Sequence, residues 1–417
     1  MAEMPSPDLL YLILRDALSA GPHHPSISAL HRCNIALTCK QFATIATNIP
    51  HAWNKIVIPF VNPPSCRYIR RCISLSEAVP LEVSLICNIS AETPPGPLSL
   101  ARRCRSHRAQ AFVHQFMTLL DEHFSRIEAL SVQLADGAAS ELWLRYLTRM
   151  NCAVLQALSM RLHLTSDIEV AGTRAAFTTL LPSIRTLTCV AFFPPATFAP
   201  AAGALTSLAI SRVWGRSSVV YDEVMDMLAA LPNLHTLRLG RVECAFAPSA
   251  PVTSTPRVVA LPLVDTVDFF VGPPSTTDIL CSLSLPAMKT LNLDIFPSSD
   301  LPWFSARCEN LLAGCKTFGL RLVGDVDPKP VTAMLSFTPN VTCLSFARTP
   351  PQHAYVVHSA IGPAKLPLLA RLEVPWSVHS DALRAHLQRR IAGAVIEVIQ
   401  PAAKERYTIK SGTLVTL

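Results

Sequence analysis

The sequence lacks the short motifs that identify many enzymes. Its 417 residues include only 14 glycines, and they contain no Gly-x-Gly-x-x-Gly, no Gly-Lys-Ser/Thr loop and no His-Glu-x-x-His. These motifs bind dinucleotides, nucleotide phosphates and catalytic zinc, respectively. We therefore expect no enzyme activity, with no catalytic residue, no metal and no cofactor.

Cysteine motifs are also absent. The 13 cysteines are an odd number, scattered as single residues, and none belongs to a Cys-x-x-Cys pair. This pattern favours buried free thiols in a reducing compartment over a zinc site or a disulfide framework. A cysteine-dependent hydrolase or transferase stays open as an alternative, because a catalytic cysteine and its histidine partner need only be close in space.

Charge is sparse and nearly balanced. Charged residues make up 16% of the chain, and the net charge is +7. That excess permits an acidic partner without requiring a nucleic acid, and the basic run over residues 102–108 has no interleaved aromatic residue. The longest charge-free stretch, residues 186–211, is broken by prolines. We expect no nucleic acid, no membrane, no secretory signal, and a cytoplasmic or nuclear location.

Hydrophobic residues, half of the chain, recur as Leu-x-x-Leu-x-Leu; the clearest copy lies within residues 231–239. In a strand, the fourth and sixth positions of this pattern point to one face and the fifth to the other. The first position recurs ten times, at intervals of 21–30 residues: Ile127, Leu155, Ile184, Leu205, Leu234, Val264, Met288, Cys315, Val341 and Leu369. This period is that of leucine-rich repeats.

The pattern predicts an α/β fold, a leucine-rich-repeat solenoid over residues 127–399. The ninth position, usually Asn or Cys, varies here from Ala135 to Phe296 and Thr349, so we expect an irregular horseshoe. Helices are expected between the strands, and further elements around them. The expected helices are 107–123, 138–150, 174–181, 221–231, 276–283 and 380–391; the added strands are 56–58, 80–85 (first in the array) and 395–399, with a cap over 400–417.

Strand residues that alternate with the buried ones should line the concave face. Solenoids commonly bind partners there, and a strip with charges of both signs and one exposed aromatic, Phe270, favours a protein or peptide. The predicted partner-binding residues are Arg161, Arg238, Asp268, Phe270, Asn292, Asp294, Arg321 and Arg371.

Residues 1–60 predict a small helical unit, with helices over 4–20 and 26–47. Three separated segments of this unit resemble the F-box found in large fungal protein families. They are Pro7-Asp8-Leu9-Leu10 with Ile13-Leu14, Leu37-Thr38-Cys39-Lys40-Gln41-Phe42, and Ile49-Pro50-His51-Ala52-Trp53. The segments depart from the family pattern at Asp8, Phe42 and Ala52, which replace Glu, Trp and Leu.

The resemblance implies a substrate-recognition adaptor of a Skp1-cullin-F-box-type ubiquitin ligase, a monomer within a larger complex. Its contacts with a Skp1-like adaptor would be Pro7, Leu9, Leu10, Ile13, Leu37, Cys39, Lys40 and Phe42. Residues 61–126 would form a linker, a first strand and a capping helix. Alternatively, the N-terminal unit only caps the array, and the protein is an interaction scaffold without a ligase link.

Overall fold

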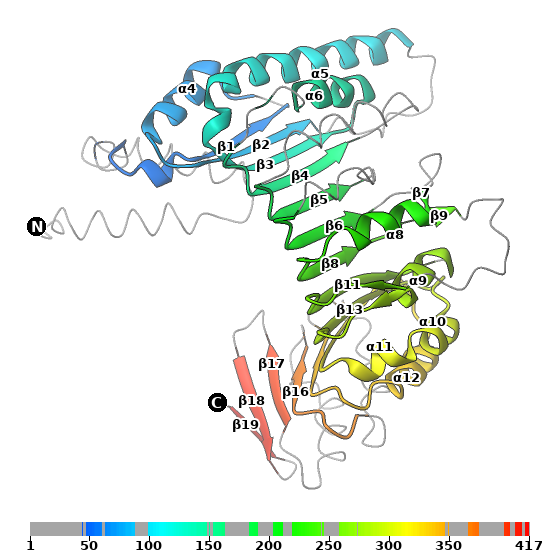
Figure 1. The fold of residues 1–417 in the computed structure, drawn as a ribbon. Coiled ribbons are helices and arrows are strands. Elements are labelled where there is room, and N and C mark those ends of the chain that lie inside the picture. Colours follow the sequence, from blue (N-terminus) through cyan, green and yellow to red (C-terminus); the bar gives the residue numbers. More distant parts are fainter. Residues whose placement is uncertain are drawn as a thin grey trace, which may run out of the picture. The chain divides into compact units, whose positions relative to one another are not determined.

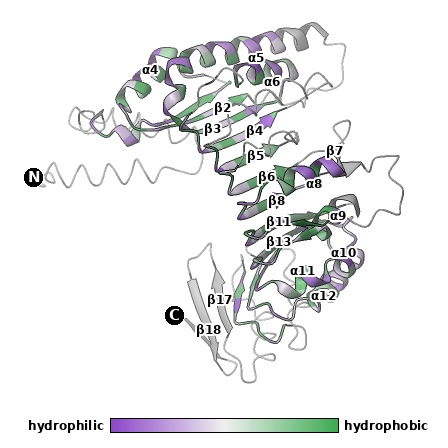
Figure 2. Cartoon of the chain, in the orientation of Figure 1, coloured by the Kyte–Doolittle hydropathy of each residue, from purple (hydrophilic) through white to green (hydrophobic). Residues whose placement is uncertain are grey.

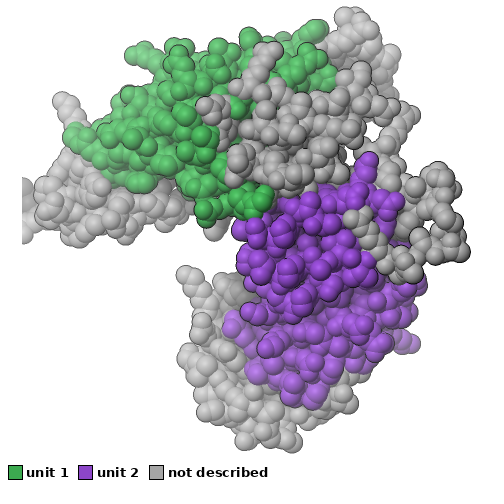
Figure 3. Space-filling model, viewed as in Figure 1, with its two compact units in different colours: residues 1–204 green, residues 205–417 purple. Residues whose placement is uncertain are grey.

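The computed structural model of the chain, drawn in Figure 1, describes residues 44, 47–60, 63–87, 99–147, 150, 153–162, 183–190, 203–211, 219–242, 244–245, 258–272, 274–346, 349, 366–374, 396–400, 405–410 and 413–416. The helices predicted over 4–20, 174–181 and 380–391 lie outside these residues, as does nearly all of the one over 26–47. The protein is α/β with mostly parallel strand pairing. It divides into two compact units, Met1–Ala204 and Leu205–Leu417 (Figure 3).

Unit 1 contains a parallel sheet whose strand order follows the sequence, β1-β2-β3-β4-β5. The strand predicted over 56–58 is confirmed as β1, and it pairs with β2, so the sheet begins one strand earlier than we expected. The elements are η1 (Pro50–Ala52), β1 (Lys55–Pro59), α4 (Cys66–Leu75), β2 (Leu81–Cys87), α5 (Ser99–Leu120), η2 (Asp121–Arg126), β3 (Ile127–Leu134), α6 (Gly137–Leu147), β4 (Ala157–Leu162) and β5 (Thr186–Val190).

Helices α4, α5 and α6 lie on one side of the unit 1 strands (Figure 1). Helix α5 begins eight residues before the predicted start, so the basic run over 102–108 lies within this helix. Phe112 and Phe116 of α5 are buried and meet edge to face, with ring centroids 4.8 Å apart. Such aromatic pairs add to the burial of apolar area that holds helix and sheet together.

The main sheet of unit 2 also follows the sequence, in the order β6-β8-β11-β13-β14-β15-β16-β17-β18-β19. Pairing is parallel as far as β17 and antiparallel for the last two strands. The strand predicted over 395–399 is confirmed as β17, but it does not close the sheet, because β18 and β19 extend it within the predicted cap over 400–417. The strands are β6 (Ser207–Ser211), β8 (Thr236–Leu239), β11 (Thr266–Val271), β13 (Thr290–Ile295), β14 (Thr317–Leu322), β15 (Cys343–Ser345), β16 (Arg371–Glu373), β17 (Ile396–Gln400), β18 (Glu405–Lys410) and β19 (Thr413–Thr416).

Five helices cover one face of this sheet (Figure 1). They are α8 (Tyr221–Ala229), α9 (Pro274–Cys281), α10 (Leu301–Arg307), α11 (Glu309–Gly314) and α12 (Pro328–Leu335). Two small parallel pairs accompany them, β7 (Val219–Val220) with β9 (Cys244–Ala245) and β10 (Val259–Ala260) with β12 (Leu283–Ser284). Helices α6, α8 and α9 confirm three of the predicted helices.

Six repeats, from β8 to β16, enter the unit 2 sheet through the same backbone contacts. The N–H of Leu234 donates to the carbonyl of Leu231 at 3.3 Å, closing a tight turn before β8. The next two N–H groups, of His235 and Thr236, both donate to the carbonyl of Thr206 in the preceding repeat. The same double donation recurs at the carbonyls of His235, Asp265, Lys289, Lys316 and Thr342. In these six repeats the sequence pattern therefore reflects one repeated backbone geometry, not leucine content alone.

The core lies between the strands and the helices. The three apolar positions of all ten repeats are buried as predicted, with relative exposures from 0% to 7%. Burying each such side chain stabilises the fold by roughly 1.5–3 kcal/mol. Figure 2 shows the resulting distribution. Hydrophobic residues are concentrated in the strands, whereas the helices carry both hydrophobic and hydrophilic residues.

Candidate binding surface

One face of the unit 2 sheet carries no described helix, and we call it the open face. Phe269 of β11 points to the other side, where its ring stacks on Phe304 of α10 at 6.1 Å. Strand residues that alternate with the buried positions therefore lie on the open face, as predicted. Seven predicted partner-binding residues are there and form the open-face strip: Arg238, Asp268, Phe270, Asn292, Asp294, Arg321 and Arg371.

The strand register places Arg238, Asp268 and Asn292 side by side on β8, β11 and β13. Arg238 Nε lies 4.0 Å from Asp268 Oδ2, and Asn292 Nδ2 donates to Asp268 Oδ1 at 2.6 Å. Gly319 follows in the same row on β14. A Cβ on Gly319 would come within 2.0 Å of Asn292 Oδ1, so glycine leaves the space that the amide fills.

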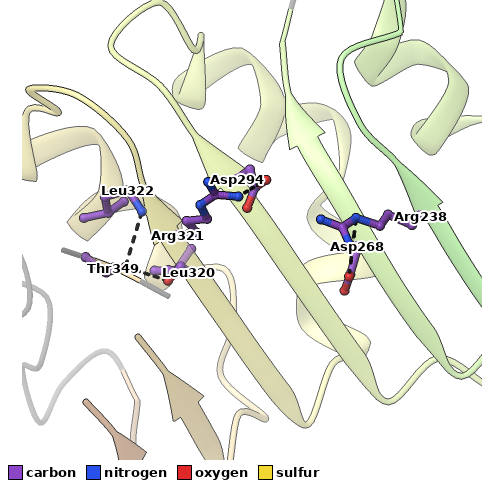
Figure 4. A network of polar contacts seen from close by, with 7 residues as sticks. All are labelled: Arg238, Asp268, Asp294, Leu320, Arg321, Leu322 and Thr349. Atoms are coloured by element: carbon purple, nitrogen blue, oxygen red, sulfur yellow. Dashed lines mark hydrogen bonds and ion pairs between the residues drawn. The ribbon is translucent and has the colours of Figure 1, made fainter. Parts of the chain in front are cut away.

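A second cross-strand pair lies two residues further along the strands, on the same face. Asp294 of β13 is the register partner of Arg321 of β14, and Arg321 Nη1 lies 3.4 Å from Asp294 Oδ2. Figure 4 shows this pair and the Arg238–Asp268 pair, each bridging neighbouring strands. Phe270 is half-buried rather than exposed as predicted, because its ring packs on Phe296 at 4.7 Å.

Charge on the strip is balanced locally. Arg371 Nη2 donates to Glu373 Oε1 at 2.8 Å within β16. Together with Arg238, Asp268, Asp294 and Arg321, these residues make three cations and three anions, each cation within 4.0 Å of an anion. A surface that neutralises itself in this way does not attract a phosphate backbone, and its polar groups are oriented before any partner arrives.

Arg161, the eighth predicted residue, lies on β4 of unit 1 and is exposed. Its register partners are Gln133 on β3 and Val190 on β5, neither of which is charged. The structure therefore does not place Arg161 in a charged row of its own unit. The eight predicted Skp1 contacts, Pro7, Leu9, Leu10, Ile13, Leu37, Cys39, Lys40 and Phe42, lie outside the described residues. Of the third F-box-like segment, Ile49, Ala52 and Trp53 are buried.

Two side chains that sequence reasoning missed join neighbouring repeats at the ends of their strands. Thr349 Oγ1 donates to the carbonyl of Leu320 at 2.7 Å and accepts from the N–H of Leu322 at 3.3 Å (Figure 4). Ser299 Oγ likewise donates to the carbonyl of Val271 at 2.5 Å and accepts from the N–H of Phe296 at 3.0 Å. Thr349 occupies the variable ninth position of its repeat. Its hydroxyl bonds backbone groups of the neighbouring repeat, as the side-chain amide of an asparagine at that position would.

Comparison with models of known protein families finds no match to this chain, and comparison with the curated proteins finds none either. Among the helices that the structure describes, none combines the length and the apolar composition needed to cross a lipid bilayer.

Proposed function

We propose that the protein is a substrate-recognition adaptor of a Skp1-cullin-F-box-type ubiquitin ligase, and that the open-face strip of unit 2 binds its protein substrate. The observation that carries the binding role is the cross-strand row of Arg238, Asp268 and Asn292, joined at 4.0 and 2.6 Å. Side chains already held in place lose little further rotamer freedom when a partner docks. Three cations balanced by three anions fit a mixed protein surface better than a polyanion.

We further propose that the array is an irregular leucine-rich-repeat solenoid whose concave side is the open face. The recurring turn and the shared carbonyl acceptor at each strand entry support this proposal. In such arrays each repeat contacts mainly its neighbours, and the concave face offers a long binding surface. The strip occupies neighbouring strands from β8 to β16, as an extended contact with a folded partner or a peptide would require.

The ligase link rests on the resemblance of Pro7-Asp8-Leu9-Leu10 and the two later segments to an F-box. A second function, an interaction scaffold without a ligase link, is favoured by one observation. Trp53 is 6% exposed, and β1, which follows it directly, is paired with β2 in the unit 1 sheet. The end of the F-box-like segment is thus built into the repeat fold, as a cap would be.

Affinity purification of the full-length chain, followed by mass spectrometry, tests both roles. Leu9→Asp with Leu10→Asp disrupts the F-box-like segment, and Arg238→Glu with Arg321→Glu reverses charge on the strip. Lys329→Glu is the matched control, since Lys329 is an exposed cation on α12, on the helix-covered face. Circular dichroism on each variant establishes that it is folded.

The adaptor hypothesis expects Skp1 and a cullin with the wild type, the strip variant and the control, and their loss from the Leu9/Leu10 variant. The substrate should disappear from the strip variant alone. A complete absence of Skp1 from the wild-type preparation refutes the ligase link and leaves the scaffold. Retention of every protein partner by the folded strip variant refutes the binding role of the open face.

A further inference from the structure

Two cysteines that are far apart in the sequence have their sulfur atoms in contact. Cys281 is the last residue of α9, and Cys308 lies at the junction of α10 and α11. Their Sγ atoms are 2.7 Å apart, although the residues are separated by 27 positions. This separation is about 0.7 Å longer than an S–S bond of about 2.05 Å, so the two thiols are in contact and not bonded.

The two thiols differ in environment. Cys308 is 2% exposed, whereas Cys281 is half-buried and reachable from solvent. Arg307, next to Cys308, forms an ion pair with Asp278 of α9 at 3.3 Å, so a guanidinium lies beside the sulfur pair. The hydrogen bond from Cys308 lowers the pKa of the Cys281 thiol and burial opposes it, while the charges of Arg307 and Asp278 make smaller contributions that lower and raise it, respectively. Burial instead raises the pKa of Cys315 to about 12.

We propose that Cys281 and Cys308 form a redox-active thiol pair, which a hydroperoxide oxidises to an intramolecular disulfide. The Cys281 thiolate attacks the terminal peroxide oxygen; the O–O bond breaks, an alcohol or water leaves, and Cys281 becomes a sulfenic acid. The Cys308 thiol then attacks that sulfur, forming the S–S bond and releasing water. The two thiols lose two electrons, and the peroxide gains them.

The disulfide would join α9 to the α10–α11 junction. Helices α9 and α10 are already neighbours, and the sulfurs need to approach by only about 0.7 Å. Both helices cover the face of the sheet opposite the open-face strip, so this site and its chemistry are independent of the proposed binding function. In a reducing compartment such a bond is transient and is reversed by thiol exchange.

Hydrogen peroxide added at a small molar excess to the native full-length protein tests the proposal, followed by alkylation and peptide mapping under non-reducing conditions. We expect a linked pair of peptides containing Cys281 and Cys308, which dithiothreitol separates. Cys66 is the internal control, being half-buried with a glutamine amide, Gln115 Nε2, 3.0 Å from its sulfur. It should be alkylated at the same rate before and after peroxide.

Variants separate the two steps. With Cys308→Ser, oxidation should stop at a Cys281 sulfenic acid, which dimedone traps as a stable adduct. With Cys281→Ser, neither an adduct at Cys308 nor a disulfide should form within the same time. Wild-type protein in which Cys281 and Cys308 both remain alkylatable after peroxide, or in which Cys66 is oxidised as fast as Cys281, overturns the proposal. The wild-type mapping decides the question even if a variant does not fold.

Discussion

The two units carry the same buried framework but different side chains at one position of each strand. In unit 1 the residue between the two buried strand positions is hydroxylated on four neighbouring strands: Ser84, Ser131, Ser159 and Thr188. In unit 2 the corresponding row, from β8 to β16, is Arg238, Asp268, Asn292, Gly319, Ser345 and Glu373. Backbone register and burial are alike, so the two units differ at this position in side-chain chemistry and not in framework.

This difference separates the residues that stabilise the fold from those that can bind a partner. The hydroxyl row is short and uncharged, and nothing in it requires a partner. The charged row contains a cross-strand ion pair, a cross-strand hydrogen bond and a glycine that makes space for an amide. A fold hosts a function through such sites rather than through its framework, and the comparison therefore points to unit 2.

The largest expected effect tests the shared framework. Leu158 in unit 1 and Leu237 in unit 2 occupy the same repeat position, with exposures of 1% and 0%. Leu158→Ala and Leu237→Ala should each lower the free energy of unfolding by about 2–5 kcal/mol, because each leaves a cavity in a packed layer. Urea denaturation measures both. A loss below about 1 kcal/mol at only one of them would show that the two layers are not equivalent.

The next effect concerns the ninth position of the repeat, at the end of each strand. In both units the ninth position can use its backbone: the N–H of Ala135 donates to the carbonyl of Cys87 at 3.2 Å, and that of Val323 donates to the carbonyl of Ile295 at 2.9 Å. In unit 2, Thr349 uses its hydroxyl and is 2% exposed. Thr349→Val should cost about 1–3 kcal/mol of unfolding free energy, since it leaves the buried N–H of Leu322 without that acceptor. Thr349→Ser, which keeps the hydroxyl, is the control and should cost clearly less.

A smaller effect concerns the space at Gly319. Gly319→Ala should cost about 0.5–1.5 kcal/mol, because the new Cβ displaces Asn292 Oδ1 and disturbs its bond to Asp268. In an Asn292→Ala background the same change should be nearly neutral, since the Cβ of residue 292 would lie 3.5 Å away, an ordinary contact. A double-mutant cycle that shows no coupling would contradict this account. Ser159→Ala, on unit 1, is the matched control.

The sequence predicted those parts of the fold that follow from a regular spacing of hydrophobic residues. The three apolar positions of each repeat and the alternation of the strands follow from the pattern around Leu234, because one buried face enforces a spacing of two. Helix α9, eight residues long, was predicted, whereas α4 and α11 were not, and neither were α10 and α12, whose seven and eight residues carry only a weak helical period. Their starts were readable: Asp300 and Asp327 cap each helix immediately before a first turn containing proline.

The sequence predicted which residues belong to the candidate site, but it did not predict all of their contacts. Alternation alone placed Arg238, Asp268 and Asn292 on one face, and parallel pairing then made them neighbours. No local pattern could tell that Phe270 would be half-buried against Phe296, or that Cys281 would meet Cys308 across 27 residues. Both contacts depend on how loops and helices return to the sheet, which the strand pattern does not encode.

The smallest expected change in stability comes from giving unit 2 the hydroxyl side chains that unit 1 has at the same strand position. This change tests most directly whether the charged row binds a partner. Replacing Arg238, Asp268 and Asn292 together by serine should alter the free energy of unfolding by no more than about 1 kcal/mol. The Arg238–Asp268 pair spans 4.0 Å, with side chains 48% and 20% exposed, and such pairs stabilise little. Affinity for the protein partner recovered with the wild-type chain should nevertheless fall at least about ten-fold, since arginine is among the residues enriched at the hot spots of protein interfaces. Isothermal titration with that partner and urea denaturation of the same preparation measure the two quantities. Unchanged affinity would leave the charged row without a role, whereas a loss of several kcal/mol in stability would make it part of the framework instead.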